Sequence, residues 1–248
     1  MFSHPLKAKY THVSRYVVAL ASCVIAAAAL TSCSSPRQPV ASCPSAEAVQ
    51  PAATTSTFTA EVWADNWFEL YANGKKVGED SVPITTERSF NSETITFTAS
   101  YPLTIGLTAK DYTENASGLE YTGTDRQQVG DGGIIAQVRD DQTCETITVT
   151  NGTWQVLALS KAPLNPSCVT SSNPTVDCKS SMITAPADWS KSDASITGWT
   201  NASVYSPEQV GVKEGYEMIT WDPAAKLVWS SDLELDNTVL LRTTIQAP

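Results

Sequence analysis

The sequence predicts an all-β protein, built from antiparallel strands that pair into a sandwich or a barrel. Three observations lead to this prediction. From residue 57 onward, short runs alternate apolar and polar residues, which is the pattern of a strand with one buried face. Turn-forming residues separate these runs, and there is almost no 3.6-residue period of the kind that an amphipathic helix shows. About ten strands at this spacing are typical of sandwiches and barrels.

The expected strands start with "TFTAEVW", residues 57–63, and continue into a hairpin. In this hairpin Asn73-Gly74 lies between "WFELYA" and "KKVG". The pair predicts a tight turn, because a type I′ turn needs a positive φ at both central residues. The alternation of the hairpin places Phe68 and Leu70 in the core. Later strands are expected at residues 93–99, 103–110, 133–139, 146–150, 153–159, 217–221, 225–229 and 238–245.

The first residues predict an export signal rather than part of the fold. A basic leader precedes "VVALASCVIAAAAL", residues 17–30, which is uncharged and too short to span a membrane. The next residues, "LTSC", resemble the bacterial lipobox, in which cleavage leaves a diacylated cysteine. We therefore expect residues 1–32 to be a lipoprotein signal peptide and Cys33 to carry the lipid. "LASC" at residues 20–23 would leave an apolar core of only about seven residues. The alternative is an ordinary secretory signal.

The composition divides the rest of the chain into a tether and a domain. Residues 33–56 contain the lipidated cysteine and then a stretch rich in Ser, Pro and Ala, which is typical of a flexible linker. Residues 57–248 are long enough for one large β domain with its own core. The expected localisation is the cell membrane, with the domain held on the extracytoplasmic face by the lipid.

Four cysteines follow the predicted anchor, and an even number in an exported domain favours disulfides over a metal site. Cys168 and Cys178 flank "VTSSNPTVD", a stretch with turn residues that allows its ends to meet. This pair is the preferred bridge, and Cys43 with Cys144 is the second one by subtraction. Four cysteines permit three pairings.

The stretch "ADNWFELYANGKKVG", residues 64–78, resembles a hairpin of galactose-binding-like jelly-roll domains. These domains are accessory sandwiches of bacterial rhamnosidases and β-galactosidases. Residues 132–156 and "GWTNASVY", residues 198–205, are similar to further segments of that family. Residues 225–245 are similar to its first strands but lie near the C-terminus, as in a circular permutation. The resemblance implies a jelly-roll β-sandwich with long polar loops and a non-catalytic binding role.

The charge balance argues against nucleic acid as a partner. The chain has 16 Lys and Arg residues against 26 Asp and Glu residues, a net charge of −10. Three of the basic residues and none of the acidic ones precede Cys33, so the mature chain would carry a net charge of −13. Such an acidic surface repels nucleic acid and anionic lipid.

The two histidines, His4 and His12, both lie in the predicted signal peptide. The mature chain would therefore lack His-based catalysis and His metal ligands. Paired carboxylates could in principle hydrolyse glycosides, but the resemblance is to the accessory module. We expect no catalytic residues, and an enzyme is the least favoured function.

The connection Ala109–Gly133 is the strongest candidate for a ligand site. It joins two predicted strands through about twenty polar residues, which is long for a compact domain. Sugar binding needs flat aromatic faces and planar polar groups, and the loop supplies both types in Asp111, Tyr112, Glu120, Tyr121 and Arg126. The alternative is a long loop packed by its own tyrosines. Trp63 and Trp67 are further candidates, as a platform for a ligand.

Asp65 and Asn66 precede the hairpin and are expected to cap the turn before it. Their oxygens are also of the kind that binds a structural Ca²⁺, which jelly rolls often hold. We expect no other metal and no other cofactor.

These observations together predict a lipid-anchored surface protein with a non-catalytic binding role, directed to a glycan or another polymer of the cell envelope. The alternative is a structural or assembly module that docks a protein partner at the envelope. It predicts an exposed apolar patch instead of an aromatic-lined groove.

Overall fold

The computed structural model describes residues 55–248, which fall within a single compact unit. The predicted signal peptide, Cys33, Cys43 and all but the last two residues of the predicted tether lie outside the described residues. Among the residues described, no helix is long and apolar enough to cross a membrane.

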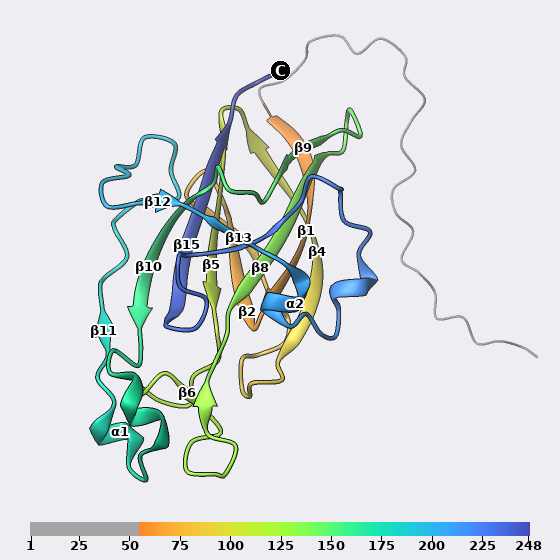
Figure 1. The fold of residues 1–248 in the computed structure, drawn as a ribbon. Helices are drawn as coiled ribbons and strands as arrows, with labels where there is room; N and C mark the ends of the chain where they lie inside the picture. Colours follow the sequence, from red (N-terminus) through yellow and green to blue (C-terminus); the bar gives the residue numbers. More distant parts are fainter. Residues whose placement is uncertain (1–54) are drawn as a thin grey trace, which may run out of the picture. The chain divides into compact units, whose positions relative to one another are not determined.

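Two antiparallel sheets form the fold, which confirms the prediction of an all-β sandwich (Figure 1). We call them sheet A and sheet B. Sheet A has the order β13-β14-β8-β1-β4, with β9 also paired to β8. Its strands are β1 (Thr55–Asp65), β4 (Phe90–Ser100), β8 (Gly133–Asp140), β9 (Thr146–Val149), β13 (Ser203–Tyr205) and β14 (Leu227–Trp229). The jelly-roll assignment within this class stays a prediction.

Sheet B has the order β11-β10-β15-β5-β2-β3, with β12 also paired to β10. Its strands are β2 (Trp67–Ala72), β3 (Lys75–Glu79), β5 (Leu103–Lys110), β10 (Gln155–Lys161), β11 (Ser181–Met182), β12 (Thr200–Asn201) and β15 (Asp236–Ile245). Four short helical segments lie in the connections: η1 (Pro166–Thr170), α1 (Pro174–Asp177), α2 (Pro207–Val210) and η2 (Tyr216–Met218).

The core between the sheets follows from strand alternation. In β1, Phe58, Ala60 and Val62 are fully buried in this core, whereas Thr59 and Glu61, which alternate with them, point to the outer face of sheet A. Phe68 and Leu70 of β2 enter the same core, as predicted. At the turn after β2, Asn73 has φ 49° and Gly74 has φ 83°, so both central residues adopt the positive φ that the Asn-Gly signal predicted.

A loop layer covers the outer face of sheet B. The segment of residues 183–200 lays Trp189 and Trp199 against Leu240 of β15, with the two indole rings stacked 6.2 Å apart. Gly106 of β5 makes room for this layer, since a Cβ there would lie 2.8 Å from Trp189. The covering segment therefore forms a second, smaller apolar cluster with the outer face of sheet B.

The outer face of sheet A is covered in the same way. Trp63 of β1 lies on this face and is fully buried, because Tyr216 packs edge-on against its indole ring at 5.5 Å. Trp221 lies in the same cluster and donates its indole N–H to the carbonyl of Tyr216 at 3.0 Å. The strand expected at residues 217–221 is therefore wrong. This stretch begins as the 3₁₀ turn η2 and then covers sheet A instead of joining it.

The preferred disulfide is confirmed. Cys168 in η1 and Cys178 directly after α1 are bonded, which ties together the two helical turns between β10 and β11. Cys144 is not a free thiol in the structure. Its expected partner, Cys43, lies outside the described residues, so that pairing stays a prediction.

Candidate functional site

Four carboxylates gather at the end of the sandwich where β1 and β5 finish, near β6 at the bottom of Figure 1. Asp65 is the last residue of β1, and Asp111 follows β5 directly. The other two come from the long connection between β5 and β8: Glu120 lies in β6 (Leu119–Glu120), and Asp131 follows β7 (Gln128–Val129). We call these four residues the acidic cluster.

Backbone hydrogen bonds bring the ends of the two strands together. The backbone N–H of Asn66 donates to the carbonyl of Lys110 at 2.8 Å, and the side-chain oxygen of Asn66 accepts from the N–H of Tyr112 at 2.6 Å. The amide nitrogen of Asn66 donates to the carbonyl of Glu87 at 3.1 Å. The peptide bond between Asp65 and Asn66 is cis. Asn66 thus positions the site, and its side chain is occupied by the fold.

Asp111 is the least satisfied group of the cluster. Its side chain is 5% exposed, and no donor in the described part of the chain forms a hydrogen bond to either carboxylate oxygen. Both side-chain atoms of Asn237, at the start of β15, also lack a hydrogen-bond partner there. Asn237 lies close enough to lower the pKa of Asp111, although no hydrogen bond of normal geometry joins the two side chains.

Burial raises the pKa of Asp111 and of Asp65 well above the ordinary value of a carboxyl group, because the charged forms lose their hydration. The neighbouring carboxylates of the cluster raise both values further. Burial also raises the pKa of Glu120 and of Asp131. The four acids are therefore close enough to oppose one another's ionisation.

Within the described part of the chain, Lys213 places a positive charge beside three of the four carboxylates. The ammonium nitrogen of Lys213 lies 3.9 Å from Oδ2 of Asp65 and above the ring of Phe90, 4.4 Å from its centre. Its charge lowers the pKa of Asp65, of Glu120 and of Asp131, but less than burial raises them. A single half-exposed lysine leaves the ionised cluster with an excess of negative charge.

The donor set is chemically suited to a hard cation. Oδ2 of Asp65 and both oxygens of Asp111 are buried without a hydrogen bond from the described chain, and Ca²⁺ prefers carboxylate and amide oxygens. Within residues 55–248, no three His, Cys, Asp or Glu side chains converge as a ready-made metal site. An ion held by Asp65 and Asp111 would therefore need the amide oxygen of Asn237, backbone carbonyls or water to complete its shell.

The backbone also fits tightly around this carboxylate. A Cβ placed on Gly130 would lie 2.5 Å from Oδ2 of Asp111. Only glycine lets the chain pass this close to the Asp111 side chain without a shift.

The other predicted ligand residues lie around this cluster with different exposures. Tyr112 is half-buried, next to the hydrogen bond that its backbone makes to Asn66. Tyr121 and Arg126 lie at the tip of the β6–β7 hairpin, where the guanidinium carbon of Arg126 stacks 3.8 Å above the Tyr121 ring. The long connection is therefore a hairpin that presents an aromatic ring and a cation, not an unstructured loop.

The two tryptophans expected to form a platform differ. Trp67 is half-exposed on the outer face of β2, with the ammonium group of Lys110 4.7 Å from its ring centre. Trp63 is fully buried, and its indole N–H donates to the carbonyl of Glu214 at 3.0 Å. The prediction that Trp63 presents a face to a ligand is wrong, because the loop that carries η2 covers it.

Sequence reasoning missed Asn237 and Lys213 as members of the site. Lys213 lies 80 residues and Asn237 104 residues beyond the Ala109–Gly133 connection. The pairing of β15 with β5 brings Asn237 there, and the loop between α2 and η2 brings Lys213. The one local signal was the polar pair Asp236-Asn237 at the start of an apolar strand.

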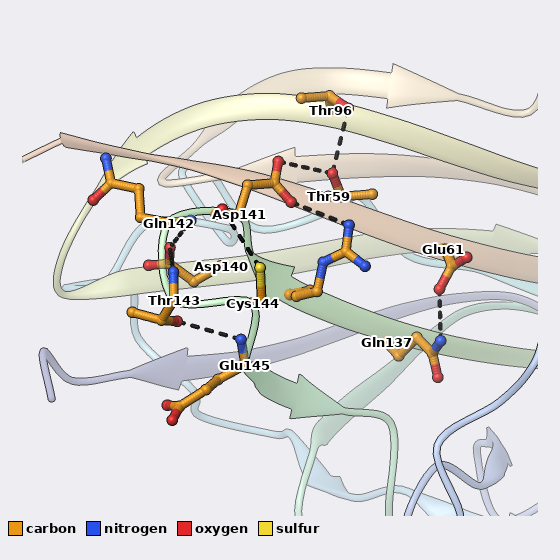
Figure 2. A network of polar contacts seen from close by, with 11 residues as sticks. Thr59, Glu61, Thr96, Gln137, Asp140, Asp141, Gln142, Thr143, Cys144 and Glu145 are labelled. Atoms are coloured by element: carbon orange, nitrogen blue, oxygen red, sulfur yellow. Dashed lines mark hydrogen bonds and ion pairs between the residues drawn. The ribbon is translucent and has the colours of Figure 1, made fainter. Parts of the chain in front are cut away.

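A second acidic group, at the opposite end of β8, provides a contrast (Figure 2). Oδ1 of Asp140 accepts from the N–H of Gln142 at 2.8 Å. Oδ2 of Asp141 accepts from the Thr59 hydroxyl at 2.9 Å, and Arg139 donates to Oδ1 at 3.4 Å. These carboxylates stabilise the turn between β8 and β9. Because they already have hydrogen-bond partners, their role is structural.

No family model, no curated protein and no solved structure matches this chain. The likeness of residues 64–78 to galactose-binding-like domains therefore stays a prediction from the sequence.

Proposed function

We propose that this protein is a non-catalytic binding module that holds Ca²⁺ in the acidic cluster and binds carbohydrate beside it. The observation that carries the proposal is the state of Asp111. Its carboxylate is buried beside Asp65, and both of its oxygens lack a hydrogen-bond donor among the described residues. Burying a carboxylate is costly unless it is paired, coordinates a metal or takes up a proton.

The residues of the site would have different roles in holding the cation. Asp65 and Asp111 would supply carboxylate oxygens and Asn237 an amide oxygen, while Asn66 holds the ends of β1 and β5 in place. A bound Ca²⁺ would supply positive charge and additional coordination positions, which suit oxygen ligands such as sugar hydroxyls. Lys213 would offset part of the remaining negative charge.

The surface beside the cluster supports carbohydrate as the ligand. Tyr112 is half-exposed on the segment that follows β5, and the Tyr121–Arg126 pair extends from the adjacent hairpin. Flat aromatic faces and planar hydrogen-bonding groups are the groups that hold sugar rings. The two tyrosines and the arginine predicted from the sequence thus belong to the same connection as Asp111, Glu120 and Asp131.

Calorimetric titration of Ca²⁺ into the chain from residue 34 onward tests the cation part. We expect binding with release of protons, because carboxyl groups with raised pKa values must ionise to bind a cation. Asp111→Asn should abolish the binding. Asp141→Asn is the matched control, since that carboxylate is already paired in the turn after β8. Absence of binding at millimolar Ca²⁺ would overturn this part.

A glycan array probed with the same chain, with Ca²⁺ and after its removal by a chelator, tests the carbohydrate part. We expect binding that depends on Ca²⁺ and that weakens in Tyr112→Ala. If Ca²⁺ still binds but no glycan binds at millimolar concentration, the cation site stands and the carbohydrate part of the proposal is overturned.

The membrane location is part of the same proposal. We propose that Cys33 is acylated and that the lipid holds the domain on the extracytoplasmic face of the cell membrane. The support is the sequence "LTSC" after an uncharged apolar run. Mass spectrometry of the mature N-terminus should find acyl chains on residue 33, and Cys33→Ala should release the protein. An unmodified residue 33 would contradict the anchor.

The docking of a protein partner remains the second candidate, and one observation favours it. Several large apolar side chains are exposed in the disulfide-linked region between β10 and the cover of sheet B: Leu164, Val176, Met182 and Ile183. Exposed apolar surface is a mark of protein interaction sites. Cross-linking on intact cells that is lost in Met182→Lys and retained in Asp111→Asn would favour this function.

A further inference from the structure

A cavity of about 380 Å³ lies on the outer face of sheet B, away from the acidic cluster. Its walls come from β10, from β15 and from the segment of residues 183–200 that covers this face. The lining side chains that concern a ligand are Thr153, Gln155, Ser192, Ile196, Arg242 and Thr244. The volume falls in the range of small-molecule sites, about 300–1,000 Å³.

Arg242 is the charged group of this cavity. Along β15, Val239 and Leu241 enter the core, so Leu240 and Arg242 point to the outer face of sheet B. The covering segment then buries Arg242 until only 4% of it remains exposed. A guanidinium group therefore sits in the wall of a cavity under a loop layer.

The guanidinium group is held in place but not neutralised. It donates to the carbonyl of Lys191 at 2.7 Å and to the carbonyl of Ala194 at 3.4 Å. It forms no ion pair with any residue between 55 and 248, although Asp193 lies close enough to raise its pKa slightly. Burial is the larger effect, and it lowers the pKa of Arg242.

A buried charge normally has a partner of opposite sign, because desolvation is costly. Arginine has five N–H donors in a planar fork, and the two carbonyls do not use all of them. Arg242 lines the cavity, and we infer that the donors left unused by the two carbonyls serve a ligand there. The matching group is a carboxylate, which accepts two parallel hydrogen bonds from a guanidinium.

The rest of the lining indicates what accompanies that carboxylate. Thr153, Ser192 and Thr244 contribute hydroxyl groups, and Gln155 contributes the oxygen of an amide whose nitrogen donates to Asn201. The hydroxyls of Thr153 and Thr244 also bond to Asn151 and Thr104, and each keeps a lone pair that can accept from a ligand hydroxyl. Ile196 is half-exposed and lies at the wall as an apolar contact. Short neutral hydrogen-bonding groups with one apolar contact suit a compact ligand that carries several hydroxyls.

We propose that this cavity binds a small polyhydroxylated carboxylate, of the kind that a hexuronic acid residue presents, with the carboxylate on Arg242. This site is separate from the proposed calcium-dependent one, because the two share no residue. It also goes beyond that function, since it selects for an anionic group that the acidic cluster would repel.

The test is NMR titration of the chain from residue 34 onward, with the Nε–H signal of Arg242 as the reporter. Glucuronate should shift this signal and bind, and glucose should bind at least about tenfold more weakly, since a hydrogen-bonded charged group contributes about 1.5–3 kcal/mol. Equal binding of glucose and glucuronate would overturn the proposal. Inorganic phosphate binding as tightly as glucuronate would overturn the assignment to a carboxylate.

Two variants separate a ligand site from a structural arginine. Arg242→Lys keeps the charge but loses the fork, and it should weaken glucuronate binding about tenfold. Because Arg242 also holds the covering segment, a second variant leaves it in place: Ser192→Trp, at an exposed position, fills the cavity and should abolish binding. Thr98→Trp, an exposed change on β4 in the other sheet, is the control. Unchanged binding in Ser192→Trp would show that the ligand does not enter this cavity.

Discussion

The side-chain oxygen of Asn66 accepts a hydrogen bond from the backbone N–H of Tyr112 at 2.6 Å, across 46 positions of the sequence. Together with the bond from the Asn66 N–H to the Lys110 carbonyl, it joins the end of β1 to the end of β5. Asp65 directly precedes Asn66, and Asp111 lies between Lys110 and Tyr112, so both carboxylates are next to these hydrogen bonds. The backbone therefore holds the two carboxylates near each other in spite of their mutual repulsion.

Replacement of Asn66 should destabilise the whole fold. Asn66→Ala removes an acceptor for the Tyr112 N–H and a donor to the Glu87 carbonyl, at a side chain that is fully buried. We expect the free energy of unfolding to fall by roughly 2 kcal/mol or more, because buried polar groups lose their partners. Urea denaturation measures the change. The control is Asn201→Ala, at an exposed position on β12, which should lower the free energy of unfolding by less than about 0.5 kcal/mol. Equal losses in the two variants would contradict the role of Asn66 in linking the ends of β1 and β5.

Stability of the cation-free protein should fall as the pH rises. The pKa values of Asp65 and Asp111 are raised in the folded state, so above about pH 4 the unfolded chain loses protons that the folded one retains. The destabilisation grows until the pH passes the raised pKa values. Denaturation curves at a series of pH values in the presence of a chelator measure it.

Asp111→Asn should flatten this pH dependence and raise the stability of the cation-free protein at pH 7, since it removes a buried charge. Saturating Ca²⁺ should stabilise the parent chain, by about 2.7 kcal/mol at a hundred times the dissociation constant, and should leave the variant unchanged. A variant that loses stability at pH 7 would indicate that the Asp111 charge is structural.

Asp80 should titrate near neutral pH. The pKa of Asp80 is raised to about 6, mainly by burial and to a smaller extent by the nearby Glu93, while the N–H of Val82 donates to its Oδ1 and opposes the shift. Carboxyl-carbon NMR should show a midpoint near 6 that disappears in Asp80→Asn. Because the folded pKa is raised, this group adds to the loss of stability between about pH 4 and pH 6. A midpoint at the ordinary value would contradict the burial of this carboxyl.

Gly130→Ala should disturb the cluster without adding or removing a charge. The new Cβ would lie 2.5 Å from Oδ2 of Asp111, so the carboxylate must move. We expect weaker Ca²⁺ binding in calorimetry, by about tenfold or more if one ligand is lost. Gly152→Ala is the control, because its Cβ would meet nothing closer than 3.5 Å. The same affinity in both variants would place the ion elsewhere.

Strand alternation and turn chemistry account for much of the fold. Phe68 and Leu70 enter the core, and Asn73-Gly74 makes the turn, because period-2 patterning and the φ preference of Asn-Gly act over a few residues. The Cys168–Cys178 bridge was predictable for the same reason, since only nine residues, several of them turn formers, lie between the two cysteines. The strand predicted at residues 217–221 was wrong, because five alternating residues do not specify whether a partner strand is available.

The order of residues along the chain was sufficient to predict an all-β sandwich, the core faces of its hairpin strands and the local disulfide. It did not reveal that Trp63, on an outer face, is buried by the loop with η2, or that Asp65, Asp111 and Asn237 meet at one end. These two features emerge from the folded arrangement. Alternation is a property of neighbouring residues, whereas which loop covers a face and which strand ends converge depend on pairings between segments far apart in the chain.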